Sequence, residues 1–476
     1  MAMPYPVHVI EDRWRARWEA EGIGQVDLDS ARSKRIFYNL VEFPYPSAEG
    51  LHVGHMFRYV GVDAFGRYKR MRGYEVFQPI GFDSFGIHTE NYALQVGEHP
   101  QTLTERTTAR YRDQLSRIGA SWDWSRSIRT SDPDYYRWTQ WILVQLFKAG
   151  LMYQDKTAVL WCPSCLTVLA REQTERNGSV CERCDTPVED RVMTQWFLRT
   201  TAYTDRLLAG LKDVDWPDQA KSLQERWIGR EVSTDGGVHY RLRDWLISRQ
   251  RYWGPPIPIV HCDDCGPVPV NEDELPVMLP ELDEVRPTGT GESPLAHLAE
   301  WVNTDCPACG GTARRETDVS DTFVDSSWYF LRYPSTEFND RAWDAERTRR
   351  VLPVDFYAGG TEHVQRHHLY ARFVTMALHD LGLVPFPEPI PVIRLGGLIV
   401  LAGAKMSKSR GNVISPDTYI DEYGSDVLRC ALMFSAPWDR GGEFSDRSVA
   451  GVERFLARCW RSEEHTSELQ SLTNLV

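Results

Sequence analysis

Two histidines stand three residues apart, His52 and His55, with Gly54 between them, after the breaker-rich stretch 43–50. If they begin a helix, both side chains project from one face of its first turn, toward whatever binds there. The amino end of a helix favours an anion, and Gly54 lets a flat or phosphorylated ligand approach the backbone. On its own the pattern is a modest signal, because such pairs also serve as metal half-sites or as solvated polar groups.

A second candidate is the stretch 404–412, Ala-Lys-Met-Ser-Lys-Ser-Arg-Gly-Asn. Its cations and hydroxyls, on Lys405, Ser407 and Lys408, could wrap a polyphosphate and neutralise departing negative charge. The alternative is a solvated basic loop. The stretch 404–412 strengthens the interpretation of the histidine pair as an active-site element, because both would serve the same phosphate chemistry.

Eight of the ten cysteines form four Cys-x-x-Cys pairs: Cys162/Cys165, Cys181/Cys184, Cys262/Cys265 and Cys306/Cys309. The first two pairs are separated by 15 residues, the spacing of a four-cysteine zinc ribbon. The last two are 40 residues apart, so they would close a second structural zinc site across an insertion. Disulfides or redox dithiols are the alternative, disfavoured in a cytosolic chain. Four thiolates leave no open coordination position, so neither zinc should be catalytic.

These groups need a scaffold, and the hydrophobic pattern predicts one. Residues 36–41 read as a buried strand, the breakers 43–50 as a loop and residues 51–72 as a helix, the opening unit of a doubly wound sheet. A second strand over 75–80 places Asp83 at its carboxyl end, where such folds bind ligands. A helix is expected over 134–151, and a further strand at 354–360 should lead into a helix from Thr361 to about Gly382. The fold class is therefore α/β, with a Rossmann-like parallel sheet interrupted by zinc-ribbon insertions.

Composition limits the classes of function. The 476 residues carry 54 Lys and Arg against 67 Asp and Glu, a net charge of -13, so any RNA partner must meet a local basic patch. No stretch approaches the roughly 18 consecutive apolar residues of a membrane helix, and residues 1–21 are too charged for a secretory leader. The expected location is the cytoplasm, with no membrane partner.

The two motifs together, in this order around a doubly wound core, resemble the His-Ile-Gly-His and Lys-Met-Ser-Lys-Ser signatures of class I aminoacyl-tRNA synthetases. Within that class the chain is most similar to bacterial leucyl-tRNA synthetases, over nearly all of residues 5–460. The segments that carry this resemblance are 43–47, 81–86, 227–230, 244–254 and 321–329.

The resemblance implies ATP-dependent activation of leucine to leucyl-adenylate and its transfer to tRNA(Leu). His52, His55, Lys405 and Lys408 would be catalytic, acting on ATP phosphates alongside Mg²⁺. The implied ATP-binding residues are His52, Gly54, His55, Gly360, Glu362, His367, Leu398, Ile399, Lys405, Ser407 and Lys408. The implied amino-acid-binding residues are Phe43, Tyr45, Asp83, Phe323, Ser326, Tyr329 and His363, with Asp83 pairing with the substrate ammonium group.

The chain departs from this family in three places. Only residues 231–239 stand where leucyl enzymes carry an editing domain, so post-transfer editing should be absent. The helical tRNA-binding domain is expected to be missing, and residues 461–471 resemble a translated sequencing adapter, so 461–476 should not be native. Glu42 stands where a Met is common, and Arg366 and His368 beside the expected pocket are also unusual.

The predicted organisation follows from these features. It comprises the first half of the catalytic core (1–150), an insertion with the first zinc ribbon (151–240), a second insertion with the second zinc site (241–317), the second half of the core (318–400), the lysine loop and stem-contact region (401–460) and the tail (461–476).

Three other functions stay open. One is a synthetase for valine, isoleucine or methionine, another a non-catalytic zinc-containing RNA-binding paralogue, and the third a nucleotidyltransferase that uses the same histidine helix.

Overall fold

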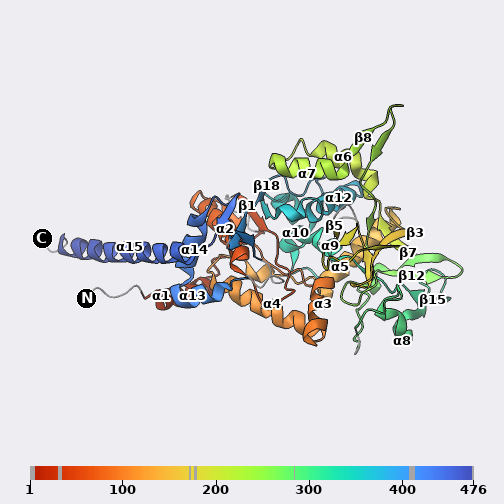
Figure 1. Cartoon of the computed structure of the whole chain (residues 1–476), viewed down its shortest axis with the longest axis horizontal. Coiled ribbons are helices and arrows are strands. Elements are labelled where there is room, and N and C mark those ends of the chain that lie inside the picture. Colours follow the sequence, from red (N-terminus) through yellow and green to blue (C-terminus); the bar gives the residue numbers. More distant parts are fainter. Residues whose placement is uncertain are drawn as a thin grey trace.

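A four-stranded parallel sheet forms the centre of the protein (Figure 1). The computed structural model describes residues 6–29, 35–170, 173–175, 179–282, 285–401, 403–406 and 413–473. The strands are β1 (Ile36–Val41), β2 (Glu75–Phe77), β17 (Phe356–Gly359) and β18 (Ile393–Leu395), in the order β18-β17-β1-β2. Both neighbours of β1 run parallel to it, and its residues 37–41 are all buried, as expected of an apolar central strand.

Helices cover both faces of this sheet. On one face, Tyr38 and Leu40 of β1 pack in one core cluster with α5 (Pro133–Lys148) and α12 (His367–Asp380). On the other, Val41 packs in a second cluster with α2 (Val53–Met71) and α14 (Ser425–Ser435). The predicted doubly wound α/β class is confirmed.

The residues between α5 and β17 carry antiparallel sheets in place of further parallel strands. The first has the order β10-β7-β3-β4 and the second the order β13-β12-β15-β14. Their strands are β3 (Met152–Cys162), β4 (Thr167–Leu169), β7 (Glu189–Leu198), β10 (Trp245–Leu246), β12 (Ile259–Cys262), β13 (Gly266–Pro269), β14 (Asn303–Asp305) and β15 (Thr312–Arg315). The first sheet holds the Cys162/Cys165 turn, while the Cys181/Cys184 turn follows a separate two-stranded sheet, and the second four-stranded sheet holds both the Cys262/Cys265 and the Cys306/Cys309 turns.

The other elements surround these sheets. The helices are α1 (Val7–Ala20), α3 (Ile87–Val96), α4 (Pro100–Arg117), α6 (Thr204–Gly210), α7 (Asp218–Ile228), α8 (Ala299–Val302), α9 (Thr322–Ser326), α10 (Tyr329–Arg332), α11 (Ala345–Val351), α13 (Pro416–Tyr423) and α15 (Asp446–Thr473). The short strands are β5 (Thr174–Glu175), β6 (Val180–Cys181), β8 (Arg230–Val232), β9 (Val238–Tyr240), β11 (Ser248–Arg249), β16 (Val319–Ser320), β19 (Leu398–Leu401), β20 (Ala404–Lys405) and β21 (Gly441–Glu443).

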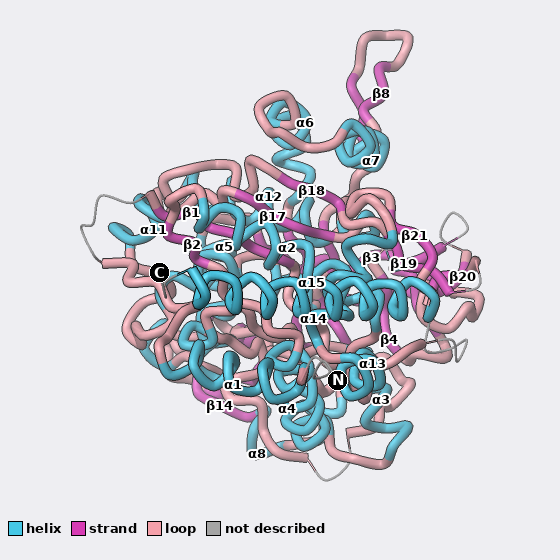
Figure 2. Tube along the Cα trace, turned by 90° about the vertical axis from the view of Figure 1, so that its left-hand side faces the viewer, coloured by secondary structure: helices cyan, strands magenta, loops and turns pink. Residues whose placement is uncertain are grey.

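The last helices gather at one end of the molecule. Figure 2 shows α13, α14 and α15 on the side that also carries α1, and α15 extends away from the body of the protein in Figure 1. Within the described part of the chain, no helix is both long and apolar enough to cross a membrane.

Two predicted elements were wrong in extent. The second strand ends at Phe77 instead of continuing to residue 80, because Pro79 has no N–H to donate to a ladder. The helix expected from Thr361 begins only at His367, after a single 3-10 turn over Thr361–His363. Arg366 has a non-helical backbone (φ -122°, ψ -100°), which separates the turn from the helix.

Candidate active site

A cavity of about 340 Å³ opens at the carboxyl ends of the parallel strands. Its walls begin directly after β1 and β17, the edge at which open α/β sheets bind ligands. Nine of the residues predicted from the sequence line it: Phe43, Tyr45, His55, Asp83, Phe323, Ser326, Glu362, His363 and His367.

The two histidines of the first motif stand at the start of α2. His52 is the residue before the first helical turn, and its backbone N–H donates to Nδ1 of His55 at 3.2 Å. The two imidazole rings stack at 3.8 Å between centroids. His55 lines the cavity, and the ring of His52 packs against the ring of His55.

The flanks of the second motif meet the same helix start. The backbone N–H of Val53 donates to the carbonyl of Ile414 at 2.9 Å, just after the motif. Just before it, Ile399 of β19 lies beside Gly54. Within the motif, Met406 is buried in the same core cluster as Val53. Ser407 and Lys408 lie outside the described residues, and Lys405 is described only as part of β20. The chain on both sides of the motif is therefore held against the histidine turn.

Asp83 supplies a buried carboxylate to the cavity. Its Oδ1 accepts hydrogen bonds from the hydroxyls of Thr322 at 3.0 Å and Thr130 at 3.3 Å. Burial outweighs both hydrogen bonds and raises the pKa of Asp83 to about 7. A cationic group bound beside it would restore the ionised form.

Tyr329 does not line the cavity. It is fully buried and stacks on Phe43, with 4.0 Å between centroids and 10° between ring planes. Its hydroxyl lies 2.8 Å from that of Tyr357, which in turn lies 2.7 Å from Nε2 of His367. Tyr329 thus supports the wall that Phe43 presents to the cavity.

Three predicted ATP-site residues that the structure describes, Gly360, Leu398 and Ile399, do not line the cavity. Gly360 follows β17, where its backbone N–H donates to Glu42 at 2.9 Å. On β19, the side chain of Leu398 is exposed and that of Ile399 is buried.

A buried charge cluster at the cavity wall was missed by sequence reasoning. The Glu42 carboxylate accepts from Arg58 at 2.9 Å, lies 2.9 Å from Nε2 of His368 and also accepts from the Gly360 N–H. Burial raises the pKa of Glu42, but its interactions with His363, His368 and Arg58 outweigh burial and hold that pKa well below its usual range. Glu42 and His368 had been noted only as departures from the family, which was the available signal.

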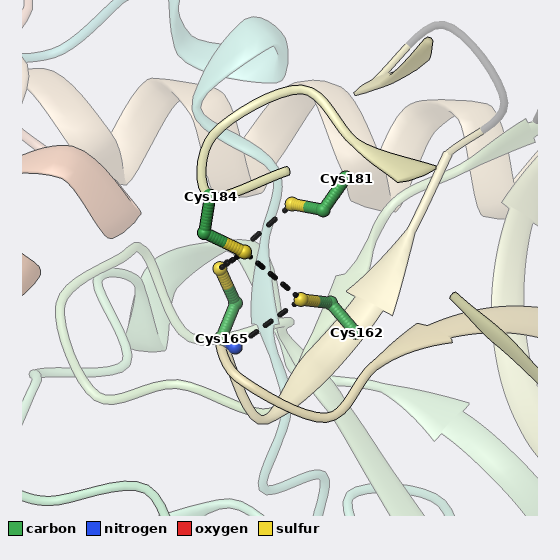
Figure 3. Close-up of side chains that lie close together, drawn as sticks. All are labelled: Cys162, Cys165, Cys181 and Cys184. Carbon is green, nitrogen blue, oxygen red and sulfur yellow. Dashed lines mark hydrogen bonds between the residues drawn. The ribbon is translucent and has the colours of Figure 1, made fainter. Parts of the chain in front are cut away.

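The first cysteine cluster reaches the cavity. Cys162, Cys165, Cys181 and Cys184 converge from two tight turns (Figure 3). Glu182 and Arg183, which stand between two of these cysteines, line the cavity, as does Gln173 just before the turn. Sequence reasoning treated this turn only as a folding element.

Both cysteine clusters have the geometry of a zinc site. In each, the four Sγ atoms lie within 4.8 Å of one another. The separations in the first cluster include 3.5 Å between Cys162 and Cys184 and 3.9 Å between Cys165 and Cys181. A tetrahedral ion with Zn–S bonds of about 2.3 Å separates its sulfurs by about 3.8 Å, whereas a disulfide requires about 2.05 Å. The cysteines fit the metal and not a disulfide.

Comparison with known proteins agrees with this geometry. The sequence model described as tRNA synthetases class I (I, L, M and V) matches residues 13–444, so the chain belongs to this family. Within the class, its relatives are leucine–tRNA ligases. Those of Rubrobacter xylanophilus and Thermotoga maritima are both 36% identical to it, over 636 and 641 residues, covering 96% of this chain and 77% of each relative.

Solved structures agree as well. A leucyl-tRNA synthetase of Agrobacterium radiobacter K84, in a ternary complex with tRNA and LeuAMS, superposes with a TM-score of 0.90 at 30% identity, over 96% of this chain and 75% of that one. Methionyl-tRNA synthetase of Mycobacterium tuberculosis superposes with a TM-score of 0.61 at 22% identity, over 88% of this chain and 68% of that one, and shares the fold.

Proposed function

We propose that the chain is a leucine–tRNA ligase. It joins the leucine carboxylate to the α-phosphate of ATP, releasing pyrophosphate, and then transfers the leucyl group from leucyl-adenylate to the terminal ribose of tRNA(Leu), releasing AMP. The observation that carries the proposal is the meeting of both motif flanks at the start of α2, on the edge of the cavity that holds Asp83. As a component of translation, the enzyme acts in the cytoplasm.

In the activation step the protein positions charges and forms no bond of its own. His55 and His52 contact the ATP phosphates from the first turn of α2, where the positive end of the helix dipole favours the developing charge. Lys405, Ser407 and Lys408 hold the departing pyrophosphate. Mg²⁺, when bound, neutralises phosphate charge. Gly54, Gly360, Glu362, His367, Leu398 and Ile399 surround the nucleoside.

Asp83 holds the ammonium group of leucine. Tyr45 and Phe43 lie beside the chain of the amino acid, and Phe323, Ser326 and His363 close the side-chain pocket. Tyr329 belongs to this pocket through its stacking on Phe43. The aromatic walls formed by Phe43, Tyr45 and Phe323, beside the carboxylate of Asp83, suit a small aliphatic amino acid.

The synthetic site works without an editing domain. The segment between α7 and β10 is a short hairpin, in which β8 and β9 are joined by the turn 233–237. The matched span of 636 residues exceeds the 476 of this chain, which is consistent with relatives that carry internal segments absent here. Nine residues cannot form a hydrolytic domain, so discrimination rests on the pocket.

The test is ATP–pyrophosphate exchange by the purified chain with leucine, valine, isoleucine and methionine in turn. We expect exchange with leucine to exceed each of the others at least tenfold in kcat/KM. A different preferred amino acid would reassign the substrate within the family. Absence of exchange with all four would favour a non-catalytic RNA-binding protein. Charging of tRNA(Leu) tests the second step.

A further inference from the structure

The turn that holds the second pair of zinc ligands also builds part of the reaction cavity. Glu182 and Arg183 reach the cavity from between Cys181 and Cys184. Glu182 forms an ion pair of 2.5 Å with Arg366, which stands just before α12. Its backbone N–H donates to the carbonyl of Gln173 at 3.2 Å. The turn is thereby fastened to the second half of the core, and Arg183 is held at the cavity wall.

Five arginines line the cavity, and four of them are matched by a carboxylate. The pairs are Arg58 with Glu42 at 2.9 Å, Arg249 with Asp321 at 2.5 Å, Arg251 with Glu90 at 2.9 Å and Arg366 with Glu182 at 2.5 Å. Buried or half-buried guanidinium groups are normally matched in this way.

Arg183 is the exception. Its Nε and Nη1 atoms are buried, and neither has a hydrogen-bond partner among the residues that the structure describes. Two donors that are shielded from water and unused leave the guanidinium in need of an acceptor. Burial, together with the nearby charges of Arg183 and Arg366, lowers the pKa of His88 to about 3.

We propose that Arg183 binds an anionic oxygen of a substrate in the reaction cavity. A guanidinium donor forms a strong, charge-assisted hydrogen bond with an oxygen of a carboxylate or a phosphate. Two kinds of substrate carry such an oxygen. One is the set of small substrates of activation (leucine carboxylate, ATP or the adenylate phosphate), and the other is a phosphodiester at the 3′ end of the tRNA. This inference rests on the proposed ligase function.

The experiment compares R183A and the charge-retaining R183K with the unaltered chain. One arm measures KM for leucine and for ATP in pyrophosphate exchange, together with calorimetric binding of LeuAMS. The other measures single-turnover transfer from preformed leucyl-adenylate to tRNA(Leu), as a function of tRNA concentration. The matched control is R191A, because Arg191 lies in the same insertion but stacks on Trp161 outside the cavity. Zinc content and thermal unfolding are measured for every variant.

We expect R183A to lose at least tenfold in one arm, with R183K intermediate and R191A unchanged. A loss in exchange and in LeuAMS binding assigns the anion to the small substrates, and a loss confined to transfer assigns it to the RNA. If R183A loses zinc or unfolds, R183Q, which is uncharged but keeps a longer polar side chain than alanine, is measured instead. Values within twofold in both arms, with zinc and folding intact, would overturn the inference. Absence of exchange in the unaltered chain would instead refute the ligase function itself.

Discussion

The carbonyl oxygen of Ile399 lies 3.9 Å from the point that a Cβ atom on Gly54 would occupy. The same Cβ would stand 2.9 Å from Cε1 and 3.0 Å from Nδ1 of the His52 ring. A Cβ atom at this position would therefore stand at ordinary contact distance from the Ile399 strand but too close to the His52 ring, so glycine here leaves the His52 ring in place.

We expect Gly54→Ala to reduce leucine-dependent exchange by about 100-fold, the usual effect of displacing a reacting group by an ångström. The protein should stay folded, because alanine favours a helix. Steady-state exchange and thermal unfolding check this. Gly451→Ala in α15 is the matched control, since a Cβ there meets nothing within 4 Å. Full activity of the Gly54 variant would show that the His52 ring need not stay where it is.

Leucine binding should depend on pH through Asp83. With a pKa of about 7, this carboxyl is mostly protonated at pH 6 and mostly ionised at pH 8. Only the ionised form can pair with an ammonium group, so KM for leucine should fall about tenfold over this range. Exchange kinetics at both pH values measure it, and a flat profile would argue against this role.

The same carboxyl affects stability with the opposite sign. Because burial raises its pKa, ionisation costs free energy in the folded state, and this cost appears as pH rises from the unfolded value through about 7. Asp83→Asn should therefore unfold at a higher temperature than the unaltered chain at pH 8, yet lose leucine activation. Calorimetry at pH 5 and pH 8 separates the effects. Equal destabilisation at both pH values would contradict the assignment.

Metal analysis should find two zinc ions per chain. Cys181→Ser and Cys306→Ser should each retain one, because each removes a ligand from a different cluster. Cys430→Ser is the control and should retain both, since Cys430 belongs to neither cluster. Mass spectrometry of the desalted protein gives the metal content. Simultaneous loss of both ions from either variant would show that the two sites are not independent.

Removing the Glu42 carboxylate from the buried cluster that it forms with Arg58 and His368 should lower the free energy of unfolding. Glu42→Gln leaves Arg58 without its carboxylate in a buried setting, for which about 3 kcal/mol of unfolding free energy is a typical loss. Urea unfolding measures the difference. Asp340→Asn, which removes an exposed partner of Arg341, should have a much smaller effect. Similar values for the two variants would mean that the cluster contributes no more than a surface pair.

Without editing, tRNA(Leu) that has been charged with the wrong amino acid should persist. A hydrophobic pocket distinguishes aliphatic amino acids that differ by one methylene by only about 1–3 kcal/mol, so valine, which is one methylene smaller than leucine, should show measurable exchange, and so should isoleucine, an isomer of leucine. Preformed isoleucyl-tRNA(Leu) should decay no faster with the enzyme than in buffer. Faster hydrolysis would reveal an editing activity located elsewhere in the chain.

Local patterns in the sequence were enough for the elements that carry the two motifs. Strand β1 was predicted with its observed limits, and the cysteine clusters followed from spacing alone, because two tight turns and one ion fix them. Long-range contacts were not predictable in this way. Nothing local indicates that Glu182 meets Arg366, or that Tyr329 is buried behind Phe43 instead of facing the ligand. Such contacts depend on how distant segments pack.

The central strand has a consequence for synthesis on the ribosome. Strand β1 pairs with β2 on one side and on the other with β17, more than 300 residues later in the chain. Until β17 emerges, one edge of β1 has no parallel neighbour, and a nascent chain with such non-local pairing folds slowly and exposes an aggregation-prone edge. The newly made polypeptide should therefore depend on chaperones until β17 has left the ribosome.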